Sequence, residues 1–407
     1  MGELSRTLEV RHISDVRRFR ARLRGPIRAY RAVAIVVLNT LICFVCLELV
    51  STAITSIRDY HLRPQSESSD ARSGSPYYAT QEWSAQYWRE FNASRMQAYH
   101  PYVIWRRRAF AGETINVDAA GVRLTPGANC GSGARKVFVF GSSTVWGTGA
   151  PDWGTLPAYL QTELQAHTNN AVCVVNYGES AYVSTQSLFQ LLLLLQSGSV
   201  PNLVLFYEGL NDAYAAYQSG IANAHENYDQ LAASFEGGGR PAEEGAVAYA
   251  VKRTSLFRVS RNLLAGLTHH LDEPSRLKTY QSLGIDSGAV ATGVAKEYLN
   301  NYAIVDALAK KYGFEYRFIW PPYIRTGHKQ LVAAEQTISG RIDPALDRLY
   351  QSVYKRVSAS AAAHPRLVDM TNVFDGSHDL LWIDEVHVTP VGNRMLAAAI
   401  AAMLTTD

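Results

Sequence analysis

The chain has 407 residues, of which 47% are hydrophobic and 18% charged, and its formal net charge is +3. This composition excludes a wholly disordered chain, which would combine low hydrophobicity with high charge. The length allows two or three structural units, and four cysteines are too few for a disulfide-dense scaffold. The small net charge gives no reason to expect a nucleic-acid partner.

The charge is nevertheless distributed unevenly. Residues 1–31 carry nine arginines and three acids, so this leader has a charge of +6 and the rest of the chain −3. The next 26 residues, 32–57, are largely apolar and carry a single charge, Glu48, and about 20 apolar residues suffice to cross the hydrocarbon of a bilayer. A buried core helix and a cleaved signal peptide are the alternatives, although the apolar core of a signal peptide is normally only ~7–15 residues.

Arginines on one side of an apolar span keep that side in the cytoplasm. We therefore expect a single-pass membrane protein with a basic cytoplasmic leader, a transmembrane helix over 32–57, and a catalytic domain outside the cytoplasm. The periplasmic side of a bacterial inner membrane fits this topology.

The exported part is predicted to begin with a linker and a small cap. Residues 58–80 are rich in serine, proline and arginine, which is typical of a tether, and residues 81–130 predict an N-terminal cap or hairpin region. Cys130 and Cys173 lie in the exported part, where disulfides persist. They are either bridged or two free buried thiols.

Five apolar runs alternate with helical patterns over residues 131–407, which predicts a doubly wound, five-stranded parallel sheet of flavodoxin-like type. The insertion 213–296 contains no clear strand and is either a mobile lid over the site or a plain surface excursion. The predicted strands are 136–141, 172–178, 203–209, 316–320 and 366–370.

Side chains able to carry out acyl transfer follow these strands, at the edge where sheets of this kind bind ligands. A serine hydroxyl becomes a nucleophile when an imidazole accepts its proton, and a carboxylate can orient that imidazole. Each motif alone is weak, but together they occur in an order that builds one site. They are Ser142 and Ser143 after the first strand, Gly178 after the second, Asn211 and Asp212 after the third, and Asp384 with His387 before the last helix.

These segments resemble the four sequence blocks of the SGNH/GDSL hydrolases, in that family's chain order and over roughly residues 130–405. The resemblance implies a catalytic triad of Ser143, Asp384 and His387, with no metal and no cofactor. It also implies an oxyanion hole formed by the backbone N–H groups of Ser143 and Gly178 and the side-chain amide of Asn211. The chain departs from the commoner motif at Ser142, where the family usually has aspartate.

The leading functional hypothesis is a serine esterase that removes acyl groups, in particular acetyl groups, from a cell-envelope or extracellular carbohydrate polymer. An O-acetyltransferase that uses the same triad is the alternative, and its acyl donor would come from a separate membrane partner. A third hypothesis is an inactive polysaccharide-binding module. Trp146 and Trp382 lie near predicted strand ends, where they either stack on sugar rings or pack in the core.

Overall fold

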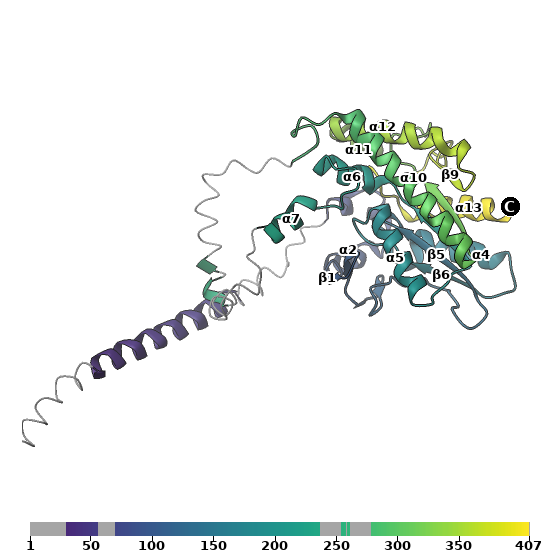
Figure 1. The fold of residues 1–407 in the computed structure, drawn as a ribbon. Coiled ribbons are helices and arrows are strands. Elements are labelled where there is room, and N and C mark those ends of the chain that lie inside the picture. Colours follow the sequence, from purple (N-terminus) through teal and green to yellow (C-terminus); the bar gives the residue numbers. More distant parts are fainter. Residues whose placement is uncertain (1–29, 56–69, 237–253, 258, 261–277, 407) are drawn as a thin grey trace, which may run out of the picture. The chain divides into compact units, whose positions relative to one another are not determined.

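A computed structural model describes residues 30–55, 70–236, 254–257, 259–260 and 278–406 of the chain (Figure 1). The chain divides into two compact units. The larger unit comprises Glu67–Gly237 and Ser275–Asp407, and the smaller comprises Met1–Ser66 and Gly238–Pro274.

The larger unit is built on a five-stranded sheet in which all neighbouring strands are parallel. Its strand order, β6-β5-β7-β8-β9, confirms the predicted flavodoxin-like arrangement. All five predicted strands are present, each within two residues of the expected bounds. They are β5 (Arg135–Gly141), β6 (Val172–Asn176), β7 (Leu203–Tyr207), β8 (Glu315–Trp320) and β9 (Leu367–Asp369).

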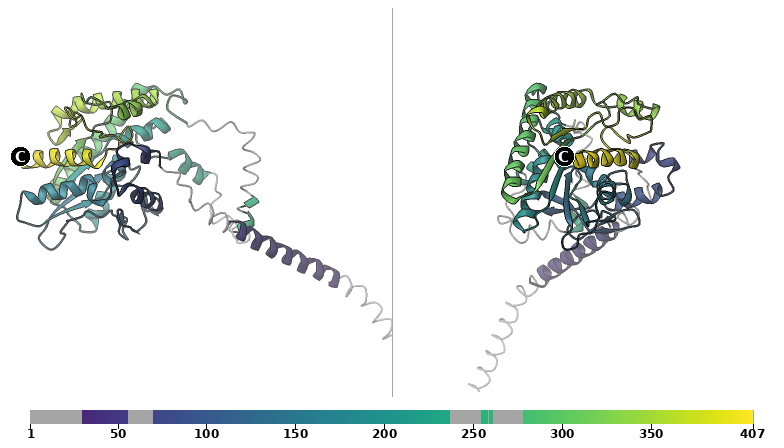
Figure 2. Two further views of the ribbon diagram at one scale, coloured as in Figure 1. Left: turned by 180° about the vertical axis from the view of Figure 1, so that it is seen from behind. Right: turned by 90° about the vertical axis from the view of Figure 1, so that its right-hand side faces the viewer.

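Helices cover both faces of this sheet (Figure 2). Helix α4 (Leu156–Ala166) packs on α13 (Pro390–Thr406), and a second group packs together around α10 (Ser287–Tyr312). The central residues of the strands, such as Val137–Phe140 and Leu203–Tyr207, are apolar and buried because the sheet is covered on both sides. The other helices of the second group are α5 (Ser184–Gln196), α6 (Leu210–Ser219) and α12 (Pro344–Ser360).

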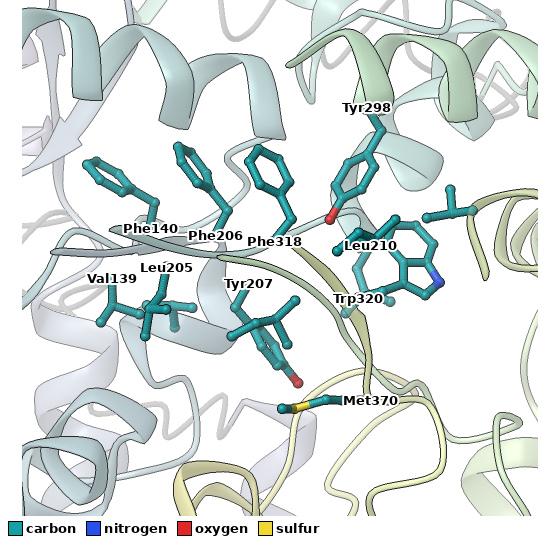
Figure 3. Close-up of a cluster of buried hydrophobic side chains, with 14 of the residues drawn as sticks. Val139, Phe140, Leu205, Phe206, Tyr207, Leu210, Tyr298, Phe318, Trp320 and Met370 are labelled. Carbon is teal, nitrogen blue, oxygen red and sulfur yellow. The ribbon is translucent and has the colours of Figure 1, made fainter. Parts of the chain in front are cut away.

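Aromatic side chains from adjacent strands form a continuous row in the core. The rings of Phe140 and Phe206 stack with centroids 5.1 Å apart, and those of Phe206 and Phe318 stack at 4.7 Å. Figure 3 shows this row on one face of the sheet beside Tyr298 of α10, with Leu205 and Tyr207 on the opposite face. The row spans β5, β7 and β8, and it therefore fixes the strands whose carboxyl ends carry the predicted site.

The cap region contains one helix and two short antiparallel hairpins. Helix α2 (Ser84–Ala93) precedes the pair β1 (Gln97–His100) and β2 (Ile104–Arg107), which β3 (Phe110–Ala111) and β4 (Asn116–Val117) follow. These elements belong to the same compact unit as the sheet.

The predicted linker 58–80 is too long at its C-terminal end. Residues 70–80 form two short 3-10 helices, η1 (Ala71–Gly74) and η2 (Tyr78–Thr80), within the larger unit. The buried Tyr78 ring lies edge-on to Trp88 at 5.2 Å, and its hydroxyl donates to the carbonyl of Gly149 at 2.7 Å. Burial of this aromatic side chain binds the end of the predicted linker to the domain.

The insertion between α6 and α10 is also shorter than the predicted range 213–296. Helix α6 continues to Ser219 and α10 begins at Ser287, while α7 (Tyr228–Glu236) lies between them. The described residues of this segment contain no strand. Residues 237–253, 258 and 261–277 lie outside the described residues, so the lid hypothesis is not tested for them.

The smaller unit contains one long apolar helix, Tyr30–Thr55, which begins and ends two residues before the predicted span. Its 26 residues include an 18-residue window with a mean hydropathy of 2.6, none of it buried. The carboxylate of Glu48 accepts hydrogen bonds from the backbone N–H groups of Ser255 and Leu256. The helix is long and apolar enough for a membrane anchor, and an N-terminal signal sequence would have the same properties.

A disulfide joins Cys130 to Cys173 at the start of the sheet, with their Cα atoms 4.8 Å apart and a sequence separation of 43. Closing a loop of this length restricts the unfolded chain and stabilises the fold by at most about 4 kcal/mol. We expect the Cys130→Ser/Cys173→Ser variant to lose about 2–4 kcal/mol in the free energy of unfolding, measured by urea titration. The matched control, Cys43→Ser/Cys46→Ser, removes two exposed free thiols of the apolar helix and should leave the urea midpoint unchanged. Equal midpoints for the two double variants would contradict the prediction.

Candidate active site

The structure brings Ser143, His387 and Asp384 into one line of hydrogen bonds. Ser143 is the first residue of the short helix α3 (Ser143–Trp146), directly after β5, and its Oγ lies 2.8 Å from His387 Nε2. On the other side of the imidazole ring, Nδ1 lies 2.7 Å from Asp384 Oδ2. Ser142 is buried and its hydroxyl contacts Thr144 Oγ1 at 3.3 Å, so Ser143 is the serine that faces the imidazole.

A tight turn holds the aspartate and the histidine at the correct separation. Asp384 Oδ1 accepts the backbone N–H groups of Val386 and His387, at 2.9 and 2.6 Å. The N–H of Ile383 donates to the carbonyl of His387 at 3.0 Å and closes the turn. Because one carboxylate oxygen holds the turn, the other is left to orient the imidazole.

A buried glutamate from outside the predicted motifs supports this turn. Glu335, in helix α11 (Ala333–Gly340), accepts the N–H groups of Leu381 and Trp382 at 2.8 and 3.1 Å. Its second oxygen pairs with Lys329 Nζ at 2.6 Å, so the buried charge is compensated. This role could not be predicted from the sequence, in which Glu335 has the features of an ordinary helix residue.

Arg72 also reaches the site, from the segment predicted to be linker. Its Nη1 lies 3.4 Å from Asp384 Oδ2 and 3.4 Å from His387 Nδ1, and its other nitrogens are held by Asp70 at 2.7 and 2.8 Å. Burial favours a raised pKa for Asp384, but the hydrogen bonds and charge of His387, together with Arg72, outweigh it and hold that pKa below its usual value. Asp384 is therefore ionised at neutral pH, as an imidazole-orienting carboxylate must be.

The predicted role of Gly178 in the oxyanion hole requires correction. Its backbone N–H already donates to Asn176 Oδ1 at 3.0 Å. A Cβ at this position would lie 2.3 Å from the backbone nitrogen of Trp146 in α3. Glycine is needed here because the chain passes close to the helix that carries Ser143, and it is not presented as a donor.

Ala181 also borders the site. It lines the pocket that contains Ser143 and His387, and its φ of +67° turns the backbone into the left-handed region. Within the described residues, its N–H has no acceptor. A left-handed alanine costs about 1 kcal/mol, and such strain persists where the surrounding structure imposes it.

Asn211 occupies the first turn of α6, just beyond the carboxyl end of β7. Because β5 and β7 pair in parallel up to Gly141 and Tyr207, Asn211 follows the strand next to the one that carries Ser143. Its side-chain amide makes no hydrogen bond to another described residue, so it is available to a ligand.

The neighbouring Asp212 has a structural role. Its carboxylate accepts the backbone N–H of Ser184 at 3.1 Å as well as the Ser184 hydroxyl, and it thereby caps the start of α5. Burial raises its pKa, and the hydrogen bonds from Ser184 partly oppose that shift. Asp212 therefore ties α5 to α6 beside the site.

The proposed sugar-stacking role of Trp146 and Trp382 is wrong. Their side chains are 0% and 2% exposed, so neither ring is accessible to a carbohydrate. The guanidinium groups of Arg107 and Arg123 lie over the Trp146 ring, at 3.7 and 4.2 Å from its centroid. Both tryptophans follow strands, as predicted, but they point into the core.

A pocket of about 540 Å³ opens beside Ser143 and His387. Its walls come from segments far apart in sequence: the cap between Phe91 and Arg107, Ser180 with Ala181, and residues 226–231 at the start of the insertion. The insertion therefore contributes directly to the site. Among the residues described, no group of three or more His, Cys, Asp or Glu side chains is arranged to hold a metal ion.

The fold and the site together define an α/β protein with a Ser–His–Asp arrangement at the carboxyl edge of a five-stranded parallel sheet. No known family model and no curated protein sequence matches the chain. Its structural neighbours are GDSL/SGNH lipolytic proteins and acetyl xylan esterases, over two-thirds of the chain.

Three of these neighbours illustrate the similarity, which is one of fold. A member of the lipolytic protein G-D-S-L family from Veillonella parvula is 15% identical, with 67% of this chain and 98% of that chain covered and a TM-score of 0.34. For an acetyl xylan esterase the identity is 13%, the coverages are 66% and 99%, and the TM-score is 0.35. A lipase/acylhydrolase from Enterococcus faecalis is 16% identical, with 67% of this chain and 96% of that chain covered and a TM-score of 0.33.

Proposed function

We propose that the protein is a serine esterase that works through an acyl-enzyme and removes acetyl groups from a carbohydrate polymer outside the cytoplasm. The observation that carries this proposal is the line of hydrogen bonds from Ser143 through His387 to Asp384, beside an open pocket. A serine, an imidazole and a carboxylate in this order are the groups that nucleophilic acyl transfer requires.

In the proposed mechanism, Ser143 Oγ attacks the ester carbonyl carbon while its proton passes to His387 Nε2. The ionised Asp384 stabilises the resulting imidazolium through Nδ1–H. When the tetrahedral intermediate collapses, the C–O bond to the sugar breaks and His387 returns the proton to the departing sugar oxygen. Water then attacks the acyl-Ser143 ester by the same steps and releases the free acid.

The developing oxyanion needs preorganised donors, and the loss of one such donor costs about 3–4 kcal/mol. The backbone N–H groups of Ser143 and Ala181 and the side-chain amide of Asn211 are proposed for this role. The first two belong to residues that line the pocket, and the amide of Asn211 has no hydrogen bond within the described residues.

A crystal structure of the protein labelled by a fluorophosphonate tests the proposed oxyanion hole, because the phosphonyl oxygen occupies the position of the oxyanion. We expect this oxygen within about 2.7–3.1 Å of the backbone nitrogens of Ser143 and Ala181. An adduct whose oxygen lies on the backbone nitrogen of Gly178 would restore the role predicted from sequence and remove Ala181 from the mechanism.

The proposed location rests on the N-terminal segment and the disulfide. An apolar helix of 26 residues follows an arginine-rich leader, which places the leader in the cytoplasm if the helix stays in the membrane. The Cys130–Cys173 disulfide lies in the larger unit, and disulfides persist in oxidising compartments such as the periplasm. A carbohydrate substrate fits this location, and Gln97, Asn227 and Gln230 supply the pocket with hydrogen-bonding groups for sugar hydroxyls.

Product analysis tests the esterase proposal. The purified protein is incubated with an acetylated polysaccharide, and free acetate is measured together with the mass of the sugar. An esterase releases acetate and lowers the mass of the polymer. If an oligosaccharide instead gains acetyl mass from an added acyl donor, the enzyme is a transferase, and if no ester is cleaved or transferred the catalytic proposal fails.

A further inference from the structure

The pocket beside Ser143 is lined by more basic than acidic side chains. Arg72, Arg95 and Arg107 contribute to its wall, whereas Glu226 is its only acid among the described residues. Arg72 and Arg107 have acidic partners: Arg72 pairs with Asp70 and Asp384, and Arg107 Nε lies 3.6 Å from Glu179. These two arginines therefore add little net charge to the pocket.

Arg95 differs from the other two arginines. It is exposed, its guanidinium lies 5.7 Å from the centre of the Phe91 ring, and its side chain forms no ion pair or hydrogen bond with a described residue. The acid whose titration it influences is Asp70, which is already hydrogen-bonded to Arg72. Arg95 thus presents an uncompensated positive charge to the pocket. Its charge also contributes to lowering the pKa of Arg107.

Glu226 does not neutralise this charge. Burial raises the pKa of Glu226 to about 7, and no charged side chain contributes to that shift. Arg95 comes from the turn between α2 and β1, whereas Glu226 comes from the segment before α7, so the two belong to different elements of the wall. The pocket therefore has a free guanidinium at one place and a half-buried carboxyl, suited to hydrogen bonds with hydroxyl groups, at another.

We propose that this pocket takes acyl esters of carboxylate-bearing sugars, that is, of an acidic polysaccharide, and that Arg95 binds a sugar carboxylate next to the reacting ester. This inference rests on the proposed function and names its substrate class. A neutral polysaccharide offers a guanidinium only hydroxyl oxygens as acceptors, whereas a carboxylate can bind its fork with two charge-assisted hydrogen bonds. Phe91 supports the guanidinium from the side and limits its freedom before substrate binds.

The test compares acetate release from three acetylated polymers. These are an acetylated polyuronate, the same polymer with its carboxylates methyl-esterified, and acetylated xylan, with p-nitrophenyl acetate as the reference ester. We divide each kcat/KM by the value for the reference ester. This relative kcat/KM should be at least about tenfold higher for the charged polyuronate than for its methyl ester. The difference should decrease with added salt, which screens the charges.

In Arg95→Gln, kcat/KM for the charged polyuronate, divided by kcat/KM for p-nitrophenyl acetate, should fall by about tenfold. The loss of one charge-assisted hydrogen bond has an effect of this size. Arg89→Gln is the matched control, because Arg89 is an exposed arginine of α2 outside the pocket, and it should leave the ratio unchanged. Equal ratios for the wild-type and Arg95→Gln proteins, or a wild-type preference for xylan, would overturn the proposal.

A binding measurement separates this proposal from the proposed catalysis. The dissociation constant of the polyuronate is measured by calorimetry with the wild-type, Arg95→Gln and Arg89→Gln proteins. We expect binding to weaken about tenfold only in Arg95→Gln. If no ester is cleaved but this loss is observed, the esterase proposal fails and the acidic-sugar site stands. If esters are cleaved but the three proteins have the same dissociation constant, the esterase proposal stands and the acidic-sugar site fails.

Discussion

Replacing Ser143 with alanine is expected to lower the rate of ester hydrolysis by about 10⁴-fold or more, since the acyl-enzyme can then no longer form. The same variant should lose covalent labelling by a fluorophosphonate probe, which reacts only with an activated serine. The expectation follows from the 2.8 Å contact between Ser143 Oγ and His387 Nε2, which is the contact that makes the hydroxyl nucleophilic. Acetate release and probe labelling of the purified protein are the two measurements.

Ser142→Ala provides the control for this experiment. Ser142 is adjacent in sequence and equally able to react in principle, but it is buried and its hydroxyl contacts Thr144 Oγ1. Labelling should therefore survive in Ser142→Ala and disappear in Ser143→Ala. The opposite pattern would assign the nucleophile to Ser142, and labelling of both variants would place it elsewhere in the chain.

The sequence sufficed to predict the sheet because each strand is a continuous apolar run between polar turns. Phe140 of β5, for example, stacks on Phe206 of the neighbouring strand β7, and both faces of the sheet are covered. The positions of Ser143 and His387 follow from the same pattern. Ser143 begins the helix that follows β5, and His387 lies just before the last helix; a parallel sheet brings the carboxyl ends of its strands, and the connections beyond them, to one edge.

Arg72 and Ala181 could not be predicted in this way. Arg72 lies in a polar, aromatic-poor stretch that reads as linker, and its contact with Asp384 depends on the packing of Tyr78 six residues later. The one available signal was the Tyr77–Tyr78 pair, because two adjacent aromatic side chains are unusual in a solvated tether. Ala181 has a φ of +67°. From sequence, a positive φ is expected at glycine and not at alanine, so this backbone conformation could not be predicted.

The same limit explains the errors at Gly178 and Trp146. A glycine after a strand indicates either a donor to a ligand or a close approach of two backbones, and the sequence does not distinguish them. Here the backbone of Trp146 occupies the space of the missing Cβ. Trp146 itself is buried in a cluster with Phe91 and other cap residues, and Arg107 and Arg123 lie over its ring.

Arg123 lies in the connection between β4 and β5, yet its side chain is 0% exposed. It pairs with Asp152 at 2.8 Å and donates to three backbone carbonyls, those of Trp146, Gly147 and Ala150, at 2.8–2.9 Å. These carbonyls belong to the loop that leaves α3, the helix with Ser143 at its start. The buried guanidinium of Arg123 therefore donates the hydrogen bonds that hold the loop after the nucleophile-bearing helix.

Arg123→Met is accordingly expected to lower the free energy of unfolding by about 3–5 kcal/mol, because it leaves the buried Asp152 carboxylate without its ion-pair partner, with Asn116 as the remaining side-chain partner, and removes one donor from each of the three carbonyls. Methionine retains the length and apolar contact of the side chain, so the loss reports the missing charge and hydrogen bonds rather than a cavity. Urea unfolding followed by tryptophan fluorescence measures it, with Arg89→Met on the exposed face of α2 expected to stay within about 0.5 kcal/mol of wild type. A loss below about 1 kcal/mol for Arg123→Met would show that water or rearranged backbone can replace the guanidinium, and the loop after α3 would then not depend on it.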